Sequence, residues 1–495
     1  MTVMPQDTRS EWQTLDKDLK RISQLELAAT YVSRPLVGLG VGLAFVIVAG
    51  LTAAVFFGTA SGSLVVVLAA IFGAYMALNI GANDVANNMG PAVGANALPM
   101  AAAIALAAVC ESAGALLAGG DVIQTVSREI ISPEPLEDPE TLVWAMLAAS
   151  LSAALWVNLA TLVRAPVSTT HAVIGGILGA GIAAAGLGAV NWSTIGQIAS
   201  GWLVAPLLGG GIAAALLALI KTQIMFVSDK LAAARFWLPI LIGLMAGSFV
   251  TYLAIKGLNR LVSVSGETAL LTGLVVGSLT CLLARPLIRR QAEGLENRNR
   301  SLKALFTVPL ILSAALLSFA HGANDVANAV GPLAAIVHTV EFGSFAAQVP
   351  VPVWVMMIGA FGISFGLFLF GPRLIRMVGQ QITRLNPMRA YCVALSTAIT
   401  VILASWLGLP VSSTHVAVGG VFGVGLFREW YMAHRLRKSR KFYALGDLMA
   451  HEEHRRRRLV RRSHLLSILA AWVVTVPASA LMSAVLFQLL QVIIS

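Results

Sequence analysis

The chain has 495 residues, of which 57% are hydrophobic and only 12% are charged, and its formal net charge is +11 at pH 7. Soluble domains carry about a quarter charged residues, so this composition excludes an ordinary soluble protein and predicts an integral membrane protein. The excess of Lys and Arg could suggest nucleic-acid binding, but these residues concentrate in a few connections between apolar segments, as membrane topology expects. We therefore expect contacts with membrane lipids and no nucleic-acid partner.

The chain begins with a polar arm, residues 1–34, which we place in the cytoplasm. The first apolar stretch starts near Val37, and nothing before it resembles a cleavable signal peptide. From there, apolar runs long enough to cross about 30 Å of hydrocarbon recur almost to the C-terminus. We predict an all-α integral membrane protein with about 12 transmembrane helices. The candidate spans lie at about 35–58, 62–95, 97–120, 142–164, 166–187, 196–219, 236–256, 268–288, 304–338, 350–372, 390–409, 411–427 and 464–494.

Basic residues mark alternate connections between these spans. Strict alternation from a cytoplasmic N-terminus places four basic segments inside, namely Lys221 to Arg235, Arg285 to Lys303, Arg373 to Arg389 and Arg428 to Arg462. The acidic segment at residues 134–140 then lies outside. This arrangement agrees with the positive-inside rule, which counts Lys and Arg and gives little weight to acidic residues.

The second candidate span carries the segment Gly81-Ala-Asn83-Asp84-Val-Ala-Asn87, which recurs near the middle of the chain. A carboxylate in an apolar span costs several kcal/mol unless it is paired or coordinated. Amide oxygens flank it one helical turn apart, and nearby Gly and Pro residues suggest a broken helix that frees backbone carbonyls. Oxygen ligands suit hard cations, so we predict a sodium or proton coupling site; hydrogen bonding between helices is the alternative. The predicted cation-binding residues are Asn83, Asp84, Asn87, Asn324, Asp325 and Asn328, with Asp84 and Asp325 as the sodium ligands if the coupling ion is sodium.

A single carboxylate, Glu111, lies in the next candidate span. The corresponding part of the second half, near Gly359, contains only apolar and glycine residues. An asymmetric role in coupling is one interpretation of Glu111, and pairing within the helix bundle is the other.

Two further segments, Pro166-Val-Ser-Thr-Thr-His171 and Pro410-Val-Ser-Ser-Thr-His415, are typical of helix starts, with Pro restricting φ and Ser or Thr capping the helix or donating hydroxyls. Helix N-termini direct backbone N–H groups and positive dipole ends toward anions. Two such termini would surround a tetrahedral oxyanion such as phosphate, although each could be an ordinary helix cap. The predicted phosphate-binding residues are Ser168, Thr169, Thr170, Ser412, Ser413 and Thr414. His171 and His415 are coupling candidates or structural donors.

The two motifs together reveal an internal duplication. Asn83 and Asn324 are 241 residues apart, and His171 and His415 are 244 residues apart. Two such segments in the same order at matched spacing do not arise by chance. The shift is seven candidate spans, and an odd shift inverts the second copy relative to the first. If the Pro-Val-Ser segments are re-entrant hairpins and not full crossings, the parity changes unless another segment compensates, for example the long stretch at 62–95. Inverted repeats of this kind build secondary transporters with one central site.

The domain organisation follows from this duplication. The basic 428–463 segment is best explained as a solvated loop that fixes topology, with affinity for anionic lipid head groups as the alternative. The predicted units are the arm 1–34, transmembrane repeat 1 at 35–220, a connecting segment with one span at 221–267, repeat 2 at 268–427, the basic loop 428–463 and a C-terminal transmembrane helix at 464–495.

These four segments, with the run from Glu111 to Gly119, make the chain similar to the PiT family of inorganic phosphate transporters, over roughly residues 65–427. The resemblance implies an inverted-repeat helical fold with re-entrant hairpins, cation-coupled uptake of phosphate by alternating access and a homodimer. It implies that Asn83, Asp84, Asn324 and Asp325 bind the cations. It also implies that Ser168, Thr169, Ser412 and Ser413 contact phosphate.

Other functions can be weighed against this one. Sulfate is the nearest rival substrate, since the same hydroxyls would accept it. An intramembrane hydrolase built from Asp84, Ser168 and His171 is disfavoured because catalysis needs one triad, whereas every candidate occurs twice. A passive anion channel does not explain paired buried carboxylates. We therefore expect no enzyme activity, no cofactor beyond the coupling ion, and a location in the bacterial cytoplasmic (inner) membrane.

Overall fold

The computed structural model describes residues 37–58, 62–132, 138–162, 167–257, 264–343, 351–381, 385–438 and 462–494. Within these ranges every regular element is a helix, apart from an isolated bridge between Ile131 and Val190. Eleven of the described helices are long and apolar enough to cross a membrane. The predicted all-α membrane fold is therefore confirmed. The predicted polar arm and most of the predicted basic loop lie outside the described residues.

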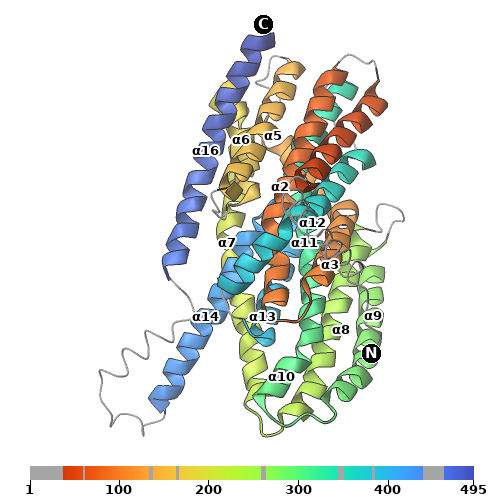
Figure 1. Ribbon diagram of the computed structural model, residues 1–495, viewed down its shortest axis with the longest axis vertical. Helices are drawn as coiled ribbons and strands as arrows, with labels where there is room; N and C mark the ends of the chain where they lie inside the picture. The colour runs from red at the N-terminus through yellow and green to blue at the C-terminus, as the bar shows by residue number, and fades with distance from the viewer. Residues whose placement is uncertain are drawn as a thin grey trace, which may run out of the picture.

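The helices follow one another through the whole described chain (Figure 1). The first half contains a helix at Val37–Phe57, then α2 (Ser63–Gly94), α3 (Met100–Ala118), α4 (Gly120–Gln124), η1 (Thr125–Glu129), α5 (Pro139–Leu162), α6 (Thr169–Ala185), η2 (Leu187–Ala189) and α7 (Trp192–Ile220). The second half contains η3 (Lys221–Met225), α8 (Lys230–Lys256), α9 (Gly266–Ala292), α10 (Asn299–Leu305), α11 (Thr307–Phe342), α12 (Val353–Gln381), α13 (Pro387–Trp406), α14 (Ser413–Lys438) and α16 (Arg462–Ile494).

The two helices that carry the Asn-Asp segments, α2 and α11, run in opposite directions. At one end, Gly62 at the start of α2 lies against the side chain of Val340 near the end of α11. At the other end, Ala95 just after α2 and Thr307 at the start of α11 line the same pocket. Equivalent helices that run antiparallel are the signature of an inverted repeat.

The two repeats are interlocked. Helix α2 packs against α12, and its counterpart α11 packs against α3; likewise α6 packs against α16, and α14 against α7. Small residues permit these contacts. A Cβ atom on Gly179 of α6 would collide with the backbone of Ala480 in α16, and one on Gly423 of α14 with the backbone of Gly210 in α7. These two glycines therefore allow close helix packing.

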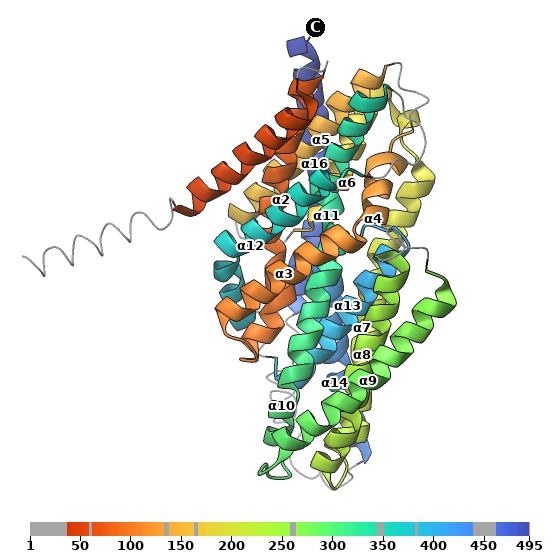
Figure 2. The same cartoon turned by 90° about the vertical axis from the view of Figure 1, so that its right-hand side faces the viewer.

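Two helical hairpins, α5–α6 and α13–α14, lie in opposite halves of the molecule and point toward its middle (Figures 1 and 2). Helix α6 has only 17 residues, which is shorter than the roughly 20 of a typical crossing. Its N-terminus and that of α14 are buried, and the Thr170 hydroxyl at one tip donates a hydrogen bond to the Val411 carbonyl at the other, at 3.2 Å. The segments that begin α6 and α14, from Val167 and from Val411, are therefore the tips of re-entrant hairpins that meet inside the protein.

The expectation of a helix break at the Asn-Asp segments is wrong, because α2 and α11 are continuous through them. The repeated Gly residues serve close packing instead: a Cβ on Gly81 would collide with the backbone of Ile363, and one on Gly322 with the backbone of Glu111. Only the prolines loosen the helices. Pro91 has no N–H, so the carbonyl four residues earlier lacks its usual helical donor, and the same holds for Pro332.

Candidate functional site

The two aspartates lie in the middle of the molecule, beside the hairpin tips. Asp84 on α2 and Asp325 on α11 are each 1% exposed. The hydroxyl of Thr169 donates to Asp84 Oδ2 at 3.1 Å, and that of Thr414 donates to Asp84 Oδ1 at 3.1 Å. The hydroxyl of Ser413 donates to Asp325 Oδ2 at 3.3 Å. The hydroxyls predicted to bind an anion thus donate hydrogen bonds directly to the carboxylates that were predicted to bind cations.

Amide side chains join each motif helix to the hairpin tip of the other repeat. Asn87 Nδ2 donates to Thr414 Oγ1 at 2.8 Å, and its counterpart Asn328 Nδ2 donates to Thr170 Oγ1 at 3.0 Å. The two hydrogen bonds are related by the same offsets as the motifs. All four predicted segments therefore form one centre, built equally from both repeats.

The neighbouring amides contact the backbone of the tips. Asn83 Nδ2 donates to the Val167 carbonyl at 3.3 Å, and Asn324 Nδ2 donates to the Leu409 carbonyl at 3.2 Å. Asn324 Oδ1 also accepts from the Val411 N–H at 3.2 Å. These contacts fix the position of the helix starts relative to α2 and α11.

Ser168 and Ser412 cap their helices. The Ser168 Oγ accepts from the His171 N–H at 3.2 Å, and the Ser412 Oγ accepts from the His415 N–H at 3.3 Å. Each hydroxyl proton remains available to a ligand, because only the oxygen is used by the cap. The first two N–H groups of α6 and of α14 have no acceptor within their own helices by position. Each tip thus offers backbone and hydroxyl donors that suit an oxyanion.

His321, which the sequence interpretation missed, connects the carboxylates. Its Nε2 lies 2.8 Å from Asp325 Oδ2 and 4.0 Å from Asp84 Oδ2, and its Nδ1 lies 3.3 Å from Glu111 Oε1. The His321 side chain is completely buried. One ligand atom from each of Asp84, His321 and Asp325 falls within 4.8 Å of the others. A comparison of the repeats would have revealed it, since Ile80 stands at the matching position before the first motif.

Glu111 also belongs to this network. Its Oε1 accepts from Asn88 Nδ2 at 2.7 Å, and the residue is 1% exposed. The predicted pairing of Glu111 within the bundle is therefore present, and its proximity to His321 places it beside the central aspartates.

The network is asymmetric. Ser112 Oγ and Ser364 Oγ lie 2.7 Å apart where α3 crosses α12. We take these two serines as corresponding positions of the two repeats, so that residues 252 apart are equivalent in these helices. The counterpart of Glu111 is then the apolar Ile363, four residues from the expected position near Gly359. Since Ile80 replaces His321 in the first repeat, the ionisable pair exists on one side only.

The two predicted histidines lie together at the interface between the repeats. The ring of His171 is 4.7 Å from that of His415 and 3.9 Å from that of Trp202, measured between centroids. Both imidazoles are buried. Their predicted role in coupling stays a prediction.

Comparisons with known proteins agree with this geometry. The sequence profile of the phosphate transporter family matches residues 80–483. The chain belongs to the phosphate transporter family. It is 43% identical to a candidate phosphate permease of Helicobacter pylori (strain J99), over 95% of this chain and 98% of that one. It is 33% identical to the chloroplastic inorganic phosphate transporter 2-1 of Arabidopsis thaliana, over 84% of this chain and 70% of that one.

A solved structure matches as well. A sodium-dependent phosphate transporter is 32% identical, with a TM-score of 0.77, over 87% of this chain and all of that one. The predicted resemblance to phosphate transporters is therefore confirmed, and the chain is a transporter of phosphate in a membrane, not an enzyme.

Proposed function

We propose that the protein takes up inorganic phosphate by sodium symport, with both substrates bound at the centre formed by the Asn-Asp helices and the hairpin tips. The observation that carries this proposal is the set of direct hydrogen bonds from the tip hydroxyls to Asp84 and Asp325. The similarity to a sodium-dependent transporter favours sodium over the proton as the coupling ion.

The charges explain why a cation is needed. Two like unit charges about 4 Å apart repel by about 4 kcal/mol at an effective dielectric constant near 20. Phosphate would thus bind roughly a thousandfold more weakly for each ionised aspartate beside it than next to a neutralised one. A sodium ion on each aspartate would remove this repulsion.

The hydroxyls provide the link between the two substrates. In the structure the protons of Thr169, Ser413 and Thr414 point toward carboxylate oxygens. Asp84, Asp325 and these hydroxyl oxygens would hold a sodium ion as oxygen ligands. Each hydroxyl would keep its proton and could then donate its hydrogen bond to phosphate instead of to the carboxylate. Sodium therefore binds before phosphate in the proposed order.

The interlocked repeats would supply alternating access. Asn83 and Asn87 on α2 are half-buried, whereas their counterparts Asn324 and Asn328 on α11 are buried. The two sides of the centre thus differ in accessibility, as expected if the repeats exchange conformations during transport.

Uptake of radiolabelled phosphate into proteoliposomes tests this proposal. We expect an inward sodium gradient to drive uptake, with a proton gradient or excess sulfate having little effect. Asp84→Asn and Asp325→Asn should each abolish the sodium dependence while the protein stays folded. An uptake rate that depends on neither the sodium nor the proton gradient would disprove symport. Strong inhibition of phosphate uptake by excess sulfate would indicate that sulfate is the substrate.

Two other assignments complete the proposal. We propose that the transporter is a homodimer, as the resemblance implies, and that it lies in a bacterial inner membrane, since bacterial proteins are among its relatives. Mass measurement in detergent and fractionation of the host membranes test them.

A further inference from the structure

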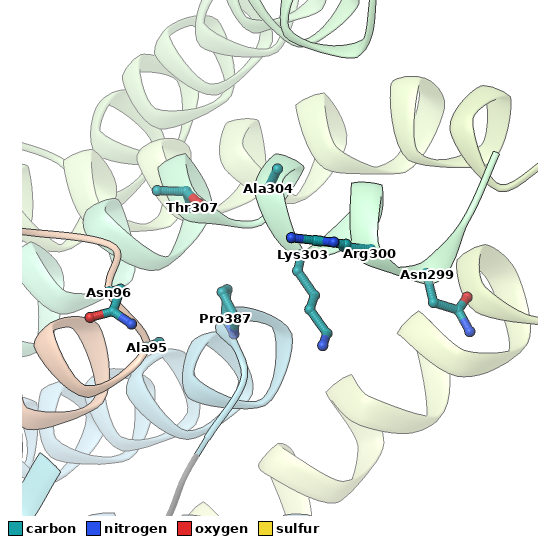
Figure 3. A pocket seen from close by; sticks show the side chains of 8 residues that line it. All are labelled: Ala95, Asn96, Asn299, Arg300, Lys303, Ala304, Thr307 and Pro387. Atoms are coloured by element: carbon teal, nitrogen blue, oxygen red, sulfur yellow. The ribbon is translucent and has the colours of Figure 1, made fainter. Parts of the chain in front are cut away.

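A cavity of about 640 Å³ opens away from the aspartate centre, between the end of α2, helix α10 and the starts of α11 and α13. Its polar lining residues are Asn96, Asn299, Arg300, Lys303 and Thr307. Figure 3 shows Asn96 on one side of the hollow and Asn299 on the other, with Arg300 and Lys303 between them. The cavity lies at the end of the molecule where the basic connection Arg285 to Lys303 lies.

The charge of this cavity is uncompensated. No carboxylate is among its lining residues. The nearby Arg298 pairs with Glu296 at 2.9 Å, but neither Arg300 nor Lys303 has an ion pair with any residue that the structure describes. Both side chains are exposed to solvent. Two cations therefore face one cavity, and no carboxylate of the described part of the chain lines it or pairs with them.

Neutral donors accompany the two cations. Asn96 adopts a left-handed backbone conformation with φ of 56°, which Asn tolerates better than most residues. Hydrogen bonds from the Asn96 N–H to the Val93 carbonyl and from the Ala97 N–H to the Ala92 carbonyl hold this turn in place. A guanidinium, an ammonium and side-chain amide and hydroxyl donors around one cavity are the groups that recognise a phosphate group.

We propose that this cavity is a second anion site, which binds a phosphate group between Arg300 and Lys303. Its volume falls within the range of small-molecule sites, about 300–1,000 Å³. Free inorganic phosphate and the head group of an anionic lipid offer the same chemistry to it. The site is distinct from the centre around Asp84, and it does not depend on sodium coupling.

Because of the position of the cavity, a bound phosphate group would affect the rate of transport. Asn96 lies two residues after the end of α2 at Gly94, and Thr307 begins α11, so a bound phosphate group bridges the two helices that carry the aspartates. An anion that bridges both repeats favours the arrangement in which these helix ends are close and shifts the equilibrium accordingly. Occupancy therefore slows transport by opposing the relative movement of the repeats.

The test compares two double variants in proteoliposomes. Arg300→Gln with Lys303→Gln removes the proposed site. Arg289→Gln with Arg290→Gln removes the same charge from exposed positions at the end of α9 that do not line the cavity. Both proteins should elute as the wild type does in size-exclusion chromatography. Initial rates of phosphate uptake are then measured in two arms.

One arm uses neutral phosphatidylcholine and varies phosphate inside the vesicles; the other omits internal phosphate and varies the fraction of phosphatidylglycerol. We expect inhibition in at least one arm for the wild type and the Arg289/Arg290 control. The Arg300/Lys303 variant should need about ten times more inhibitor for the same effect, because it has lost two charge-assisted contacts. The arm that separates the variants identifies the ligand source. Equal responses of both variants in both arms would overturn the proposal.

Discussion

At the scale of single residues, the central feature is the shared use of hydroxyls. Thr414 donates to Asp84 from the hairpin of the opposite repeat and accepts from Asn87 at the same time. A hydroxyl has one proton and two acceptor positions, so it can serve a carboxylate, a cation or an anion in turn. In the proposed mechanism, this property makes the tips a physical link between cation binding and anion binding.

His321 is the residue most specific to one repeat. We expect His321→Ala to lower the rate of sodium-driven phosphate uptake about tenfold or more, because Asp325 and Glu111 both lose a buried partner. Such a loss costs about 1.5–3 kcal/mol. The measurement is uptake per folded transporter, with the sodium concentration for half-maximal uptake as a second readout.

His434→Ala is the matched control for this prediction. His434 is exposed and stacks on Trp430 near the end of α14, so its loss should leave uptake unchanged. An unchanged rate and sodium dependence for His321→Ala would show that the histidine is only a packing residue.

The site residues show what the sequence could and could not predict. The duplication identified the aspartates, the amides and the hydroxyls without a structure, because a repeated polar segment in an apolar span has few explanations. Similarity between the repeats did not point to His321, because Ile80 occupies the matching position; the difference between the repeats at this position is the signal that marks it. Nor could the duplication show that Thr414 donates a hydrogen bond to Asp84, because this contact joins residues of different repeats.

At the scale of helices, glycine positions determine how the repeats interlock. Gly423 of α14 and Gly210 of α7 approach so closely that neither position has room for a side chain. Gly179 of α6 likewise has no room for a side chain, because a Cβ there would collide with the backbone of Ala480 in α16. Since these helices carry the hairpin tips, their packing sets the depth at which the tips meet the aspartates.

Replacement of Gly423 tests this packing. We expect Gly423→Ala to lower the thermal unfolding midpoint by several degrees, because overpacking costs about 1–3 kcal/mol. Gly211→Ala is the control: a Cβ there meets no atom within 4 Å, so the substitution should be neutral or slightly stabilising. Thermal unfolding of both variants in detergent is the measurement. Equal midpoints would contradict the close approach of α7 and α14.

The prediction of broken helices near the aspartates failed for a physical reason. Gly and Pro near the aspartates indicated broken helices, yet α2 and α11 are continuous. A glycine inside an apolar helix can serve either a break or a close contact, and only the neighbouring helix decides between them. Gly81 and Gly322 face the backbones of α12 and α3, so close contact is the answer here.

At the scale of the whole molecule, inversion of the repeats explains why the site is single. Antiparallel α2 and α11 bring their Asn-Asp segments to the same depth, and the two hairpins enter from opposite ends to meet there (Figure 2). The odd shift of spans predicted this inversion from the sequence. The interlocked packing, in which each repeat covers the hairpin of the other, depends on contacts that no spacing rule reveals.

The central claim is that one site binds both substrates and couples their movement. Its most direct test is sodium-22 uptake into proteoliposomes that contain neither sodium nor phosphate, with a phosphate gradient directed inward. By reciprocal linkage, phosphate should drive sodium accumulation in the wild type, and Asp84→Asn and Asp325→Asn should each remove this effect. Sodium entry that is the same with and without phosphate, or coupled entry that survives both substitutions, would contradict the account.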